Sequence, residues 1–267
     1  LPDITVIKPI FHPSKDEILF FVAARGHHTD VGGLTPGSMP PDSREIEDEG
    51  VYIDNFKLVQ NGNFKKREIS DLLLGAKFPV RSLSKNLADL RAQVAACEKG
   101  ELELRDLINE YGVTLVKKYT KFVNNNASEM VRNILKSIKK GSYIYYMDDD
   151  IDNKKRKICV SVSTTKTPEK IVVDFSGTTS QTETNFNAPQ PVTRAAVLYA
   201  IRILVGGKIP MNAGLMENVK LVLPKGTILS PEYPAAVIAG NVETSQAVTS
   251  ALLLAFGVQA ASQSTMN

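Results

Sequence analysis

A long helical block between two strand-patterned ends most constrains what this chain can fold into. In residues 84–140, apolar side chains recur at helical spacing; Leu87, Leu90 and Val94 fall on one helix face. On either side, apolar residues alternate or form short β-branched runs, which is typical of strands. Strands, then helices, then mixed elements favour an α+β fold over a doubly wound parallel sheet. We therefore expect mixed or antiparallel sheets with an inserted helical hairpin or bundle.

Small and polar residues divide the helical block. We expect Ser84 to cap its first helix, Gly100 to break that helix and Gly112 to separate the next one. The run Asn124–Asn126 is a weak point of the later helix, because asparagine competes with the backbone for hydrogen bonds. The Lys and Glu residues of the block form its solvated face.

The remaining elements follow from local patterns. Expected strands cover residues 3–11, 17–24, 51–60, 142–150, 157–165, 170–177, 218–223 and 235–239, and further helices cover 191–205 and 242–256. The charged run DDDIDNKKRK, residues 148–157, is most simply a solvated hairpin loop. Residues 26–44 form a Gly- and Pro-rich loop, and loops of that length in compact domains are usually functional or disordered.

Composition excludes some classes of protein. The 267 residues hold 32 Lys and Arg against 29 Asp and Glu, a net charge of +3 that does not indicate nucleic acid or an anionic membrane as partner. No run predicts a membrane span or a signal peptide. Cys97 and Cys159 lie in apolar patterns, which indicates reduced core thiols and a cytoplasmic location. Because the chain starts at Leu1, we expect a single-domain fragment, residues 1–267, of a longer protein.

The stretch RGHHTDVGGLTPGSMPP, residues 25–41, holds two of the three histidines. Imidazole and carboxylate groups together suit a divalent metal such as Mn, Zn or Fe. On a regular strand Arg25 and His27 share one face, so His28 and Asp30 share the other. Either the strand breaks at Gly26, or one histidine binds the metal while the other donates a hydrogen bond or acts as acid or base.

Neighbouring residues extend this candidate site. Asp3 is a further oxygen donor if its strand pairs with residues 17–24. Gly32, Gly33 and Gly37 allow the backbone to turn sharply and to approach a ligand closely. The alternative interpretation is a solvated turn, and His12, beside a proline, is most simply an exposed turn residue.

Two polar loops leading into helices are further candidates. In AGNVETSQ, residues 239–246, amides at a helix start near Asn241 suit an anion or oxyanion, and Glu243 adds a carboxylate. In TNFNAPQPVTRAA, residues 184–196, Asn185, Asn187 and Arg194 are polar. Both loops are equally explained as capped helix starts. The chain contains neither a P-loop for ATP nor a G-x-S-x-G nucleophile motif.

Several stretches together resemble the hydantoinase B/5-oxoprolinase family. They are FFVAARGHHTDVGGLTPGSMPPDSREIEDEGVYIDNFKLVQNG, NLADLRAQVAACEKG, FNAP, GNVETSQ and the closing ASQSTMN. Their order and spacing cover essentially the whole chain. The NLADLRAQ and FKLVQNG motifs look closer to 5-oxoprolinases than to acetone-type carboxylase subunits.

The resemblance implies a division of labour. A hydantoinase A-type subunit or domain binds ATP, which activates an amide carbonyl of 5-oxoproline or a hydantoin, and water opens the ring. Related subunits hold a metal in this region, which implies Asp3 and His27 or His28 as ligands of a divalent ion such as Mn, Zn or Mg. The family's preceding Asp and His ligands would lie upstream of Leu1. We also expect an oligomer.

We therefore expect a component of an ATP-dependent cyclic amide hydrolase. The alternatives are an acetone-type carboxylase subunit and a non-catalytic scaffold for the ATP-binding partner. The expected site comprises catalytic His27, His28 and Asp30, metal ligands Asp3, His27 and His28, and substrate-binding Arg25, Gly32, Gly33, Asn187, Asn241 and Glu243.

Overall fold

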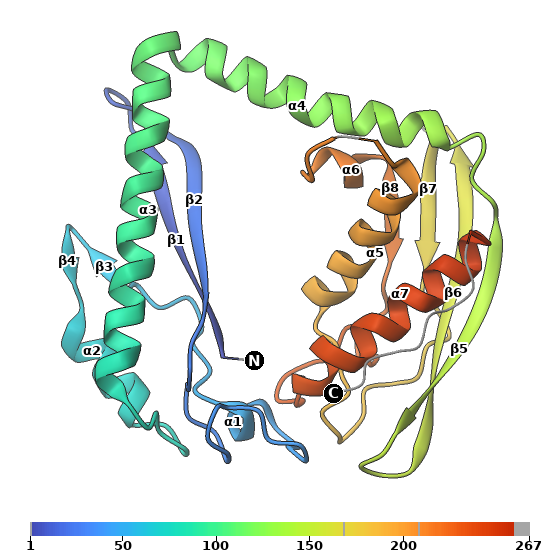
Figure 1. The fold of residues 1–267 in the computed structure, drawn as a ribbon, viewed down its shortest axis with the longest axis horizontal. Coiled ribbons are helices and arrows are strands. Elements are labelled where there is room, and N and C mark those ends of the chain that lie inside the picture. The colour runs from blue at the N-terminus through green and yellow to red at the C-terminus, as the bar shows by residue number, and fades with distance from the viewer. Residues whose placement is uncertain (1, 168, 208, 259–267) are drawn as a thin grey trace. The chain divides into compact units, whose positions relative to one another are not determined.

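The chain divides into two compact units. A computed structural model describes residues 2–167, 169–207 and 209–258 (Figure 1). Unit 1 comprises residues 1–40 and 46–117, and unit 2 comprises residues 41–45 and 118–267. Unit 1 carries the histidine-rich stretch, and unit 2 carries a four-stranded sheet with its helices. The closing ASQSTMN motif lies outside the described residues.

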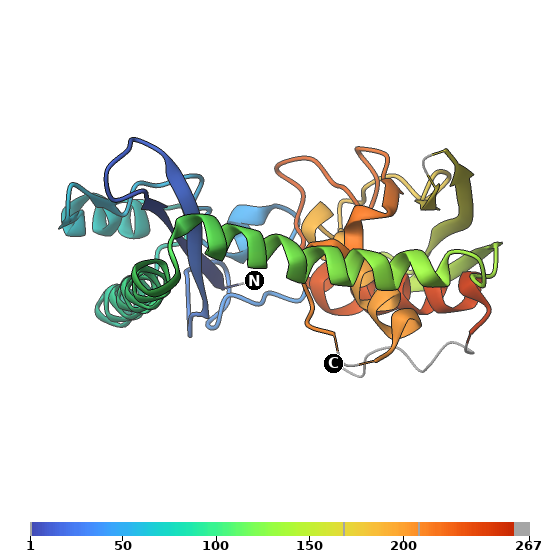
Figure 2. The same cartoon turned by 90° about the horizontal axis from the view of Figure 1, so that it is seen from above.

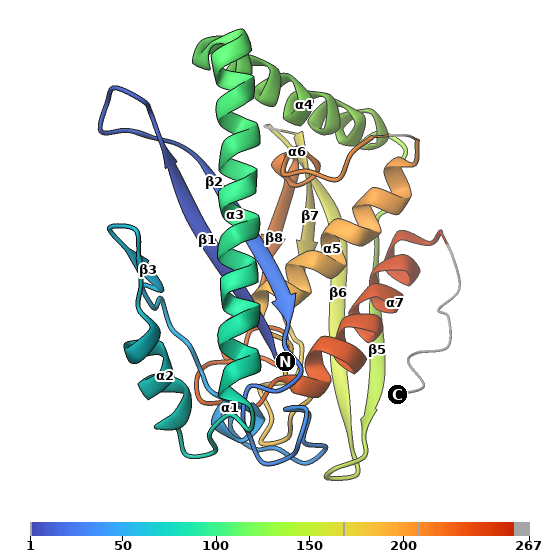
Figure 3. The ribbon, with the colours of Figure 1, turned by 60° about the vertical axis from the view of Figure 1, so that its left-hand side comes forward.

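Unit 1 is built on a β-hairpin covered by one long helix. Strands β1 (Asp3–Phe11) and β2 (Ile18–His27) pair antiparallel. Helix α3 (Leu83–Tyr111) packs on both strands, and Figure 3 shows it crossing one face of the hairpin. Figure 2 views α3 nearly along its axis, beside the hairpin. Helix α2 (Lys66–Leu74) packs against α3.

The remaining elements of unit 1 are short. Helix α1 spans Ile46–Glu49, and strands β3 (Val59–Gln60) and β4 (Asn63–Phe64) form a tight hairpin. Asn61 and Gly62 both have positive φ, as a two-residue type I′ turn requires. The predicted strand over 51–60 is wrong except at its end. Its apolar side chains pack on the unit 1 core instead, without a ladder partner.

The helical block consists of two uninterrupted helices, α3 and α4 (Val113–Ile134). The predicted separation at Gly112 is confirmed, and this glycine has a φ of 77°. The predicted break at Gly100 is wrong: a Cβ there would lie 3.4 Å from Val22 Cγ1, so the glycine sits where α3 meets β2. Helix α4 continues through Asn124–Asn126, where a weak point was predicted. Helix α3 packs in unit 1, while α4 from Lys118 onward belongs to unit 2.

Unit 2 contains a mixed sheet with strand order β5-β6-β7-β8. Strands β5 (Gly141–Asp149), β6 (Lys154–Lys166) and β7 (Glu169–Asp174) are antiparallel, and β8 (Val219–Val222) pairs parallel to β7. The α+β class with mixed sheets is therefore confirmed. Helices α5 (Gln190–Val205) and α7 (Ser245–Phe256) pack together, and a short helix α6 (Gly214–Glu217) precedes β8.

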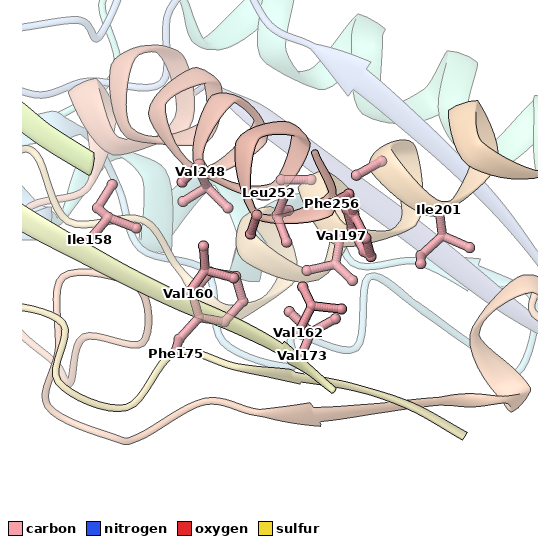
Figure 4. Packing of buried hydrophobic residues seen from close by; sticks show 14 of the residues in the cluster. Ile158, Val160, Val162, Val173, Phe175, Val197, Ile201, Val248, Leu252 and Phe256 are labelled. Carbon is pink, nitrogen blue, oxygen red and sulfur yellow. The ribbon is translucent and has the colours of Figure 1, made fainter. Parts of the chain in front are cut away.

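The core of unit 2 lies between the sheet and these helices. Alternate residues of β6 point toward the helices, because successive strand side chains face opposite sides. Figure 4 shows Ile158, Val160 and Val162 of β6 facing Val248 and Leu252 of α7. All five side chains are nearly inaccessible to solvent. This packing holds the loops that enter α5 and α7 in place.

The predicted strand over 235–239 is wrong. Ala235 makes only an isolated bridge to Glu45, and a π-helical turn, η1 (Gly240–Thr244), leads into α7. The alternative interpretation of this loop as a helix start capped by Asn241 is also wrong, because Asn241 lies inside η1 and its N–H donates to the carbonyl of Val237. Among the residues that the structure describes, no helix combines the length and apolarity that crossing a bilayer requires.

Candidate functional site

Four polar side chains gather on one face of the hairpin, at its open end. The register pairs Asp3 with His27 and Thr5 with Arg25, so these side chains project from the same face. The prediction that Arg25 and His27 share a face is thereby confirmed. Asp3 Oδ1 lies 3.0 Å from His27 Nδ1, and Asp3 Oδ2 accepts a hydrogen bond of 3.1 Å from Arg25.

The electrostatics of this cluster keep Asp3 ionised. Burial alone would raise the pKa of the Asp3 carboxyl. The hydrogen bond from His27 and the positive charge of Arg25 outweigh burial and hold this pKa below its ordinary value. A carboxylate only accepts hydrogen bonds, so Nδ1 of His27 carries the proton. In a neutral imidazole Nε2 is then the lone-pair nitrogen, and the His27 side chain is 62% exposed.

His28 lies in a different environment, buried beneath the hairpin with 1% exposure. Its Nε2 is 3.0 Å from Gln93 Oε1. The amide nitrogen of Gln93 donates to the carbonyls of Ile4 and Ala24, at 2.7 and 3.0 Å, which fixes Oε1 as the acceptor facing His28. Nε2 of His28 therefore carries the proton. Gln93 links both strands to the histidine that follows them.

The other ring nitrogen of His28 also faces protein groups. Nδ1 lies 3.5 Å from the side-chain nitrogen of Asn86 and 3.8 Å from a carboxylate oxygen of Asp89. Asn86 in turn donates to the backbone carbonyl of Asp30 at 2.6 Å. His28 thus connects the end of β2 to the first turns of α3. The two neighbouring histidines therefore differ, one exposed and one enclosed.

Asp30 organises the loop that follows. Its carboxylate accepts hydrogen bonds from the amides of Gly32 and Gly37 and from the guanidinium of Arg81, at 2.9, 3.0 and 2.7 Å. Burial would raise the pKa of this carboxyl, but the surrounding N–H donors outweigh it and lower the pKa. Both oxygens are therefore occupied by donors within unit 1.

Asp30→Asn is expected to destabilise the protein by about 2 kcal/mol at pH 7, because it removes charge-assisted hydrogen bonds from a half-buried site. Since the folded-state pKa of Asp30 lies below its unfolded value, ionised Asp30 stabilises the fold above that unfolded value. This contribution is lost as the pH falls through the lower folded-state pKa. Urea unfolding at pH 7 and pH 3 checks this. A difference between wild type and variant that is equal at both pH values would contradict it.

The predicted ligand-approach glycines pack tightly against the protein backbone. Gly32 and Gly33 have φ of 87° and 88°, and a Cβ on Gly32 would lie 2.2 Å from the carbonyl oxygen of Phe78. A Cβ on Gly33 would lie 2.7 Å from the carbonyl oxygen of Asp48. The groups that approach Gly32 and Gly33 closely are therefore backbone atoms of unit 1 itself.

The hairpin cluster supplies two donors suited to a divalent ion, Asp3 and His27. Within residues 2–167, 169–207 and 209–258, no group of three or more His, Cys, Asp and Glu side chains is placed to hold a metal. A carboxylate and an imidazole match Mn or Zn in kind, although such ions take at least one further ligand. Arg25 shares the Asp3 carboxylate.

The predicted residues of unit 2 form a separate cluster around the start of η1. The side chain of Asn187 is fully buried and donates to the carbonyls of Thr182, Thr184 and Ala236. Asn187 therefore ties its own loop to the segment before η1. Burial, and then the charge of Asp150, raise the pKa of the half-buried Glu243. Glu243 is thus the group of this cluster whose protonation the protein perturbs.

Sequence reasoning did not identify two groups of residues around these sites. Gln93 and Arg81 anchor the histidine loop, and the apolar heptad-like spacing of α3 gave no sign of Gln93. In unit 2, the buried Asp149 accepts hydrogen bonds from Arg156 and Thr184. The run containing Asp149 and Arg156 was predicted to be solvated, which is wrong for these two residues. Their opposite charges seven positions apart were the available signal.

Comparison with known proteins identifies the family. The sequence model of the hydantoinase B/oxoprolinase family matches residues 1–267. The chain belongs to the hydantoinase B/oxoprolinase family. It is 41% identical to 5-oxoprolinase 1 of Arabidopsis thaliana and 40% identical to 5-oxoprolinase of Saccharomyces cerevisiae, in each case over the whole chain. It spans about a fifth of the length of these relatives, 22% and 21% respectively.

Solved structures of larger enzymes share this fold. An ATP-dependent caprolactamase from Pseudomonas jessenii superposes with a TM-score of 0.81 and 25% identity, over 95% of this chain and 43% of that chain. An acetone carboxylase superposes with a TM-score of 0.75 at 19% identity, over 96% of this chain and 35% of that chain. The second similarity concerns the fold alone.

Proposed function

We propose that this chain is a component of an ATP-dependent amide hydrolase that opens a cyclic amide, 5-oxoproline or a hydantoin. Membership of the family and the resemblance to an ATP-dependent caprolactamase support the reaction class. The names of the 40% identical relatives support 5-oxoproline as substrate. As the family resemblance implies, ATP would bind to a hydantoinase A-type part, and the missing P-loop in this chain agrees with that assignment.

The observation that carries the proposal is the Asp3–His27 pair at the exposed end of the hairpin. Asp3 fixes the proton on Nδ1 of His27, which leaves Nε2 free to accept a proton from water or to bind a metal ion. Arg25 holds the Asp3 carboxylate in its orientation. A histidine whose tautomer is fixed by a carboxylate suits general-base catalysis.

Asp3 and His27 would also hold the divalent ion that the family implies, together with ligands from outside this cluster. Such an ion activates water or polarises the amide carbonyl. In this proposal His28 is not a ligand, because its side chain is 1% exposed and both ring nitrogens face side chains of α3, Gln93 and Asn86. His28 and Asp30 position the loop, and Asn187 supports the segment before η1. Substrate binding by Asn241 and Glu243 of unit 2 stays a prediction.

The pair of histidines provides the test. His27→Ala is expected to lower kcat for 5-oxoproline opening at least 100-fold in the assembly with its ATP-binding part, since general-base groups contribute about 10²–10⁴-fold. Its unfolding midpoint should match wild type, because His27 is exposed. His28→Ala should instead lower the unfolding midpoint, because it leaves the buried Gln93 acceptor unpaired.

His12→Ala is the matched control, because His12 lies in the exposed turn between β1 and β2. It should change neither kcat nor the unfolding midpoint. Elemental analysis of wild type beside His27→Ala tests the metal assignment separately. Wild-type activity in His27→Ala would refute the proposed role of the Asp3–His27 pair.

A further inference from the structure

The hairpin of unit 1 has an open edge along β1. Among the described residues, β2 is the only strand paired with β1. The His28 amide donates to the carbonyl of Pro2 at 2.7 Å, which sets the phase of the ladder. In antiparallel pairs the backbone groups of alternate residues face the partner strand. The even-numbered residues of β1 therefore bond to β2, and the odd-numbered residues direct their N–H and C=O groups outward.

Two independent observations agree that the even-numbered residues of β1 bond to β2. Gln93 donates to the carbonyls of Ile4 and Ala24, as expected if both point into the space between the strands. Pro9, which has no N–H, falls at an odd position, on the outward edge where no ladder donor is lost. The outward donors of β1 are therefore the amides of Asp3, Thr5 and Ile7.

A groove runs beside this edge. It has a volume of about 970 Å³, and β1 lines it from Asp3 to Phe11. Residues 51–59 form the opposite wall, and Leu90, Val94 and Cys97 of α3 contribute apolar surface. Nine strand residues extend over about 30 Å, so the groove has the length of an extended peptide. A five-membered ring would fill only a small part of it.

The charge of the side chains that line the groove favours some ligands over others. Five acidic side chains line it, against the two basic side chains Lys8 and Lys57. Lys8 and Glu101 pair with each other at 2.6 Å, and Asp3 pairs with Arg25 at 3.1 Å. The balance of charge rests on Asp54 and Glu98 against Lys57. The lining therefore repels a substrate that carries a carboxylate and attracts a cationic segment.

We propose that this groove binds an extended peptide segment of a partner polypeptide, which pairs with the open edge of β1 as a third strand. The segment has apolar side chains at alternate positions and Lys or Arg near the acidic rim. Addition of a strand to a free sheet edge supplies main-chain hydrogen bonds, and pockets for alternate side chains supply selectivity. The inference is independent of ring opening by His27.

Hydrogen exchange tests the pairing directly. The probe is the capped peptide Lys-Val-Thr-Val-Lys-Val-Thr-Val, added to the 267-residue protein at low salt. The amides of Thr5 and Ile7 should exchange at least tenfold more slowly with the peptide, while those of Val6 and Lys8, already bonded to β2, should not change. Unchanged exchange at Thr5 and Ile7 at saturating peptide would overturn the proposal, as would the absence of any binding.

Edge variants provide the second test, by fluorescence polarisation of the labelled peptide. Ile7→Pro removes an outward backbone N–H, and Ile7→Val keeps it. Ile7 is 62% exposed, so neither change disturbs the core. Binding should weaken at least tenfold in Ile7→Pro and not in Ile7→Val. The same peptide with Glu in place of Lys should bind more weakly to wild type. Equal binding by both variants, or a wild-type dimer that Ile7→Pro converts to monomer, would overturn the partner-peptide assignment.

Discussion

Gly240→Ala is expected to destabilise unit 2 by more than about 4 kcal/mol, a large part of the roughly 5–15 kcal/mol that stabilises a folded protein. A Cβ at this position would lie 1.9 Å from the carbonyl oxygen of Asn187 and 2.2 Å from its carbonyl carbon. The obstruction is backbone, which cannot rotate away as a side chain can. The Gly240 amide also donates to the carbonyl of Asn185 at 3.0 Å, so movement of η1 would break a further contact.

Gly100→Ala is the matched control, because it adds the same methyl group inside helix α3. The nearest atom to that Cβ would be Val22 Cγ1 at 3.4 Å, and alanine favours the helix by about 1 kcal/mol. We expect a change in unfolding free energy of less than about 1 kcal/mol. Urea denaturation followed by circular dichroism compares the two variants. A Gly240→Ala protein as stable as Gly100→Ala would contradict the close packing of η1 on Asn187.

Elements with a strong local pattern were predictable from the sequence. The β1–β2 hairpin, strands β5 to β7 and helix α5 all follow from alternation or helical spacing, and the structure confirms them. The segments 51–60 and 235–239 also contain β-branched residues, but only Val59 and Gln60 join a ladder and Ala235 makes a single bridge. The rest of their backbone has no strand beside it, and strand pairing is a property of the tertiary fold.

The candidate site was predictable in its residue types but not in its roles. Strand alternation placed Arg25 and His27 together, as the register confirms. Alternation could not tell which histidine is exposed and which is buried, because the residues that contact each of them lie far away in sequence. Asp3 approaches His27 from 24 positions upstream, and Gln93 encloses His28 from 65 positions downstream. Each contact depends on a fold that no local pattern describes.

The second large effect is expected at the buried ion pair of unit 2. Asp149 is fully buried, and its Oδ2 accepts hydrogen bonds from Nε and Nη2 of Arg156, at 2.9 and 2.8 Å, and from the Thr184 hydroxyl at 2.6 Å. Burial would lower the pKa of Arg156, but Asp149 and Asp152 outweigh it and raise that pKa. The pair therefore joins the β5–β6 hairpin to the loop that leads into α5.

Arg156→Met is expected to destabilise the protein by about 3–5 kcal/mol, because it leaves the buried Asp149 carboxylate without its counter-charge. The double variant Arg156→Met with Asp149→Leu should recover much of this loss, because it removes the isolated charge as well. Lys154→Met, at a largely exposed lysine beside Asp152, is the control and should leave the unfolding midpoint unchanged. Urea unfolding of all three decides the point. If Arg156→Met is as stable as the control, Asp149 obtains its stabilisation from the Thr184 hydroxyl and backbone amides, and the ion pair is not what holds the hairpin to the α5 loop.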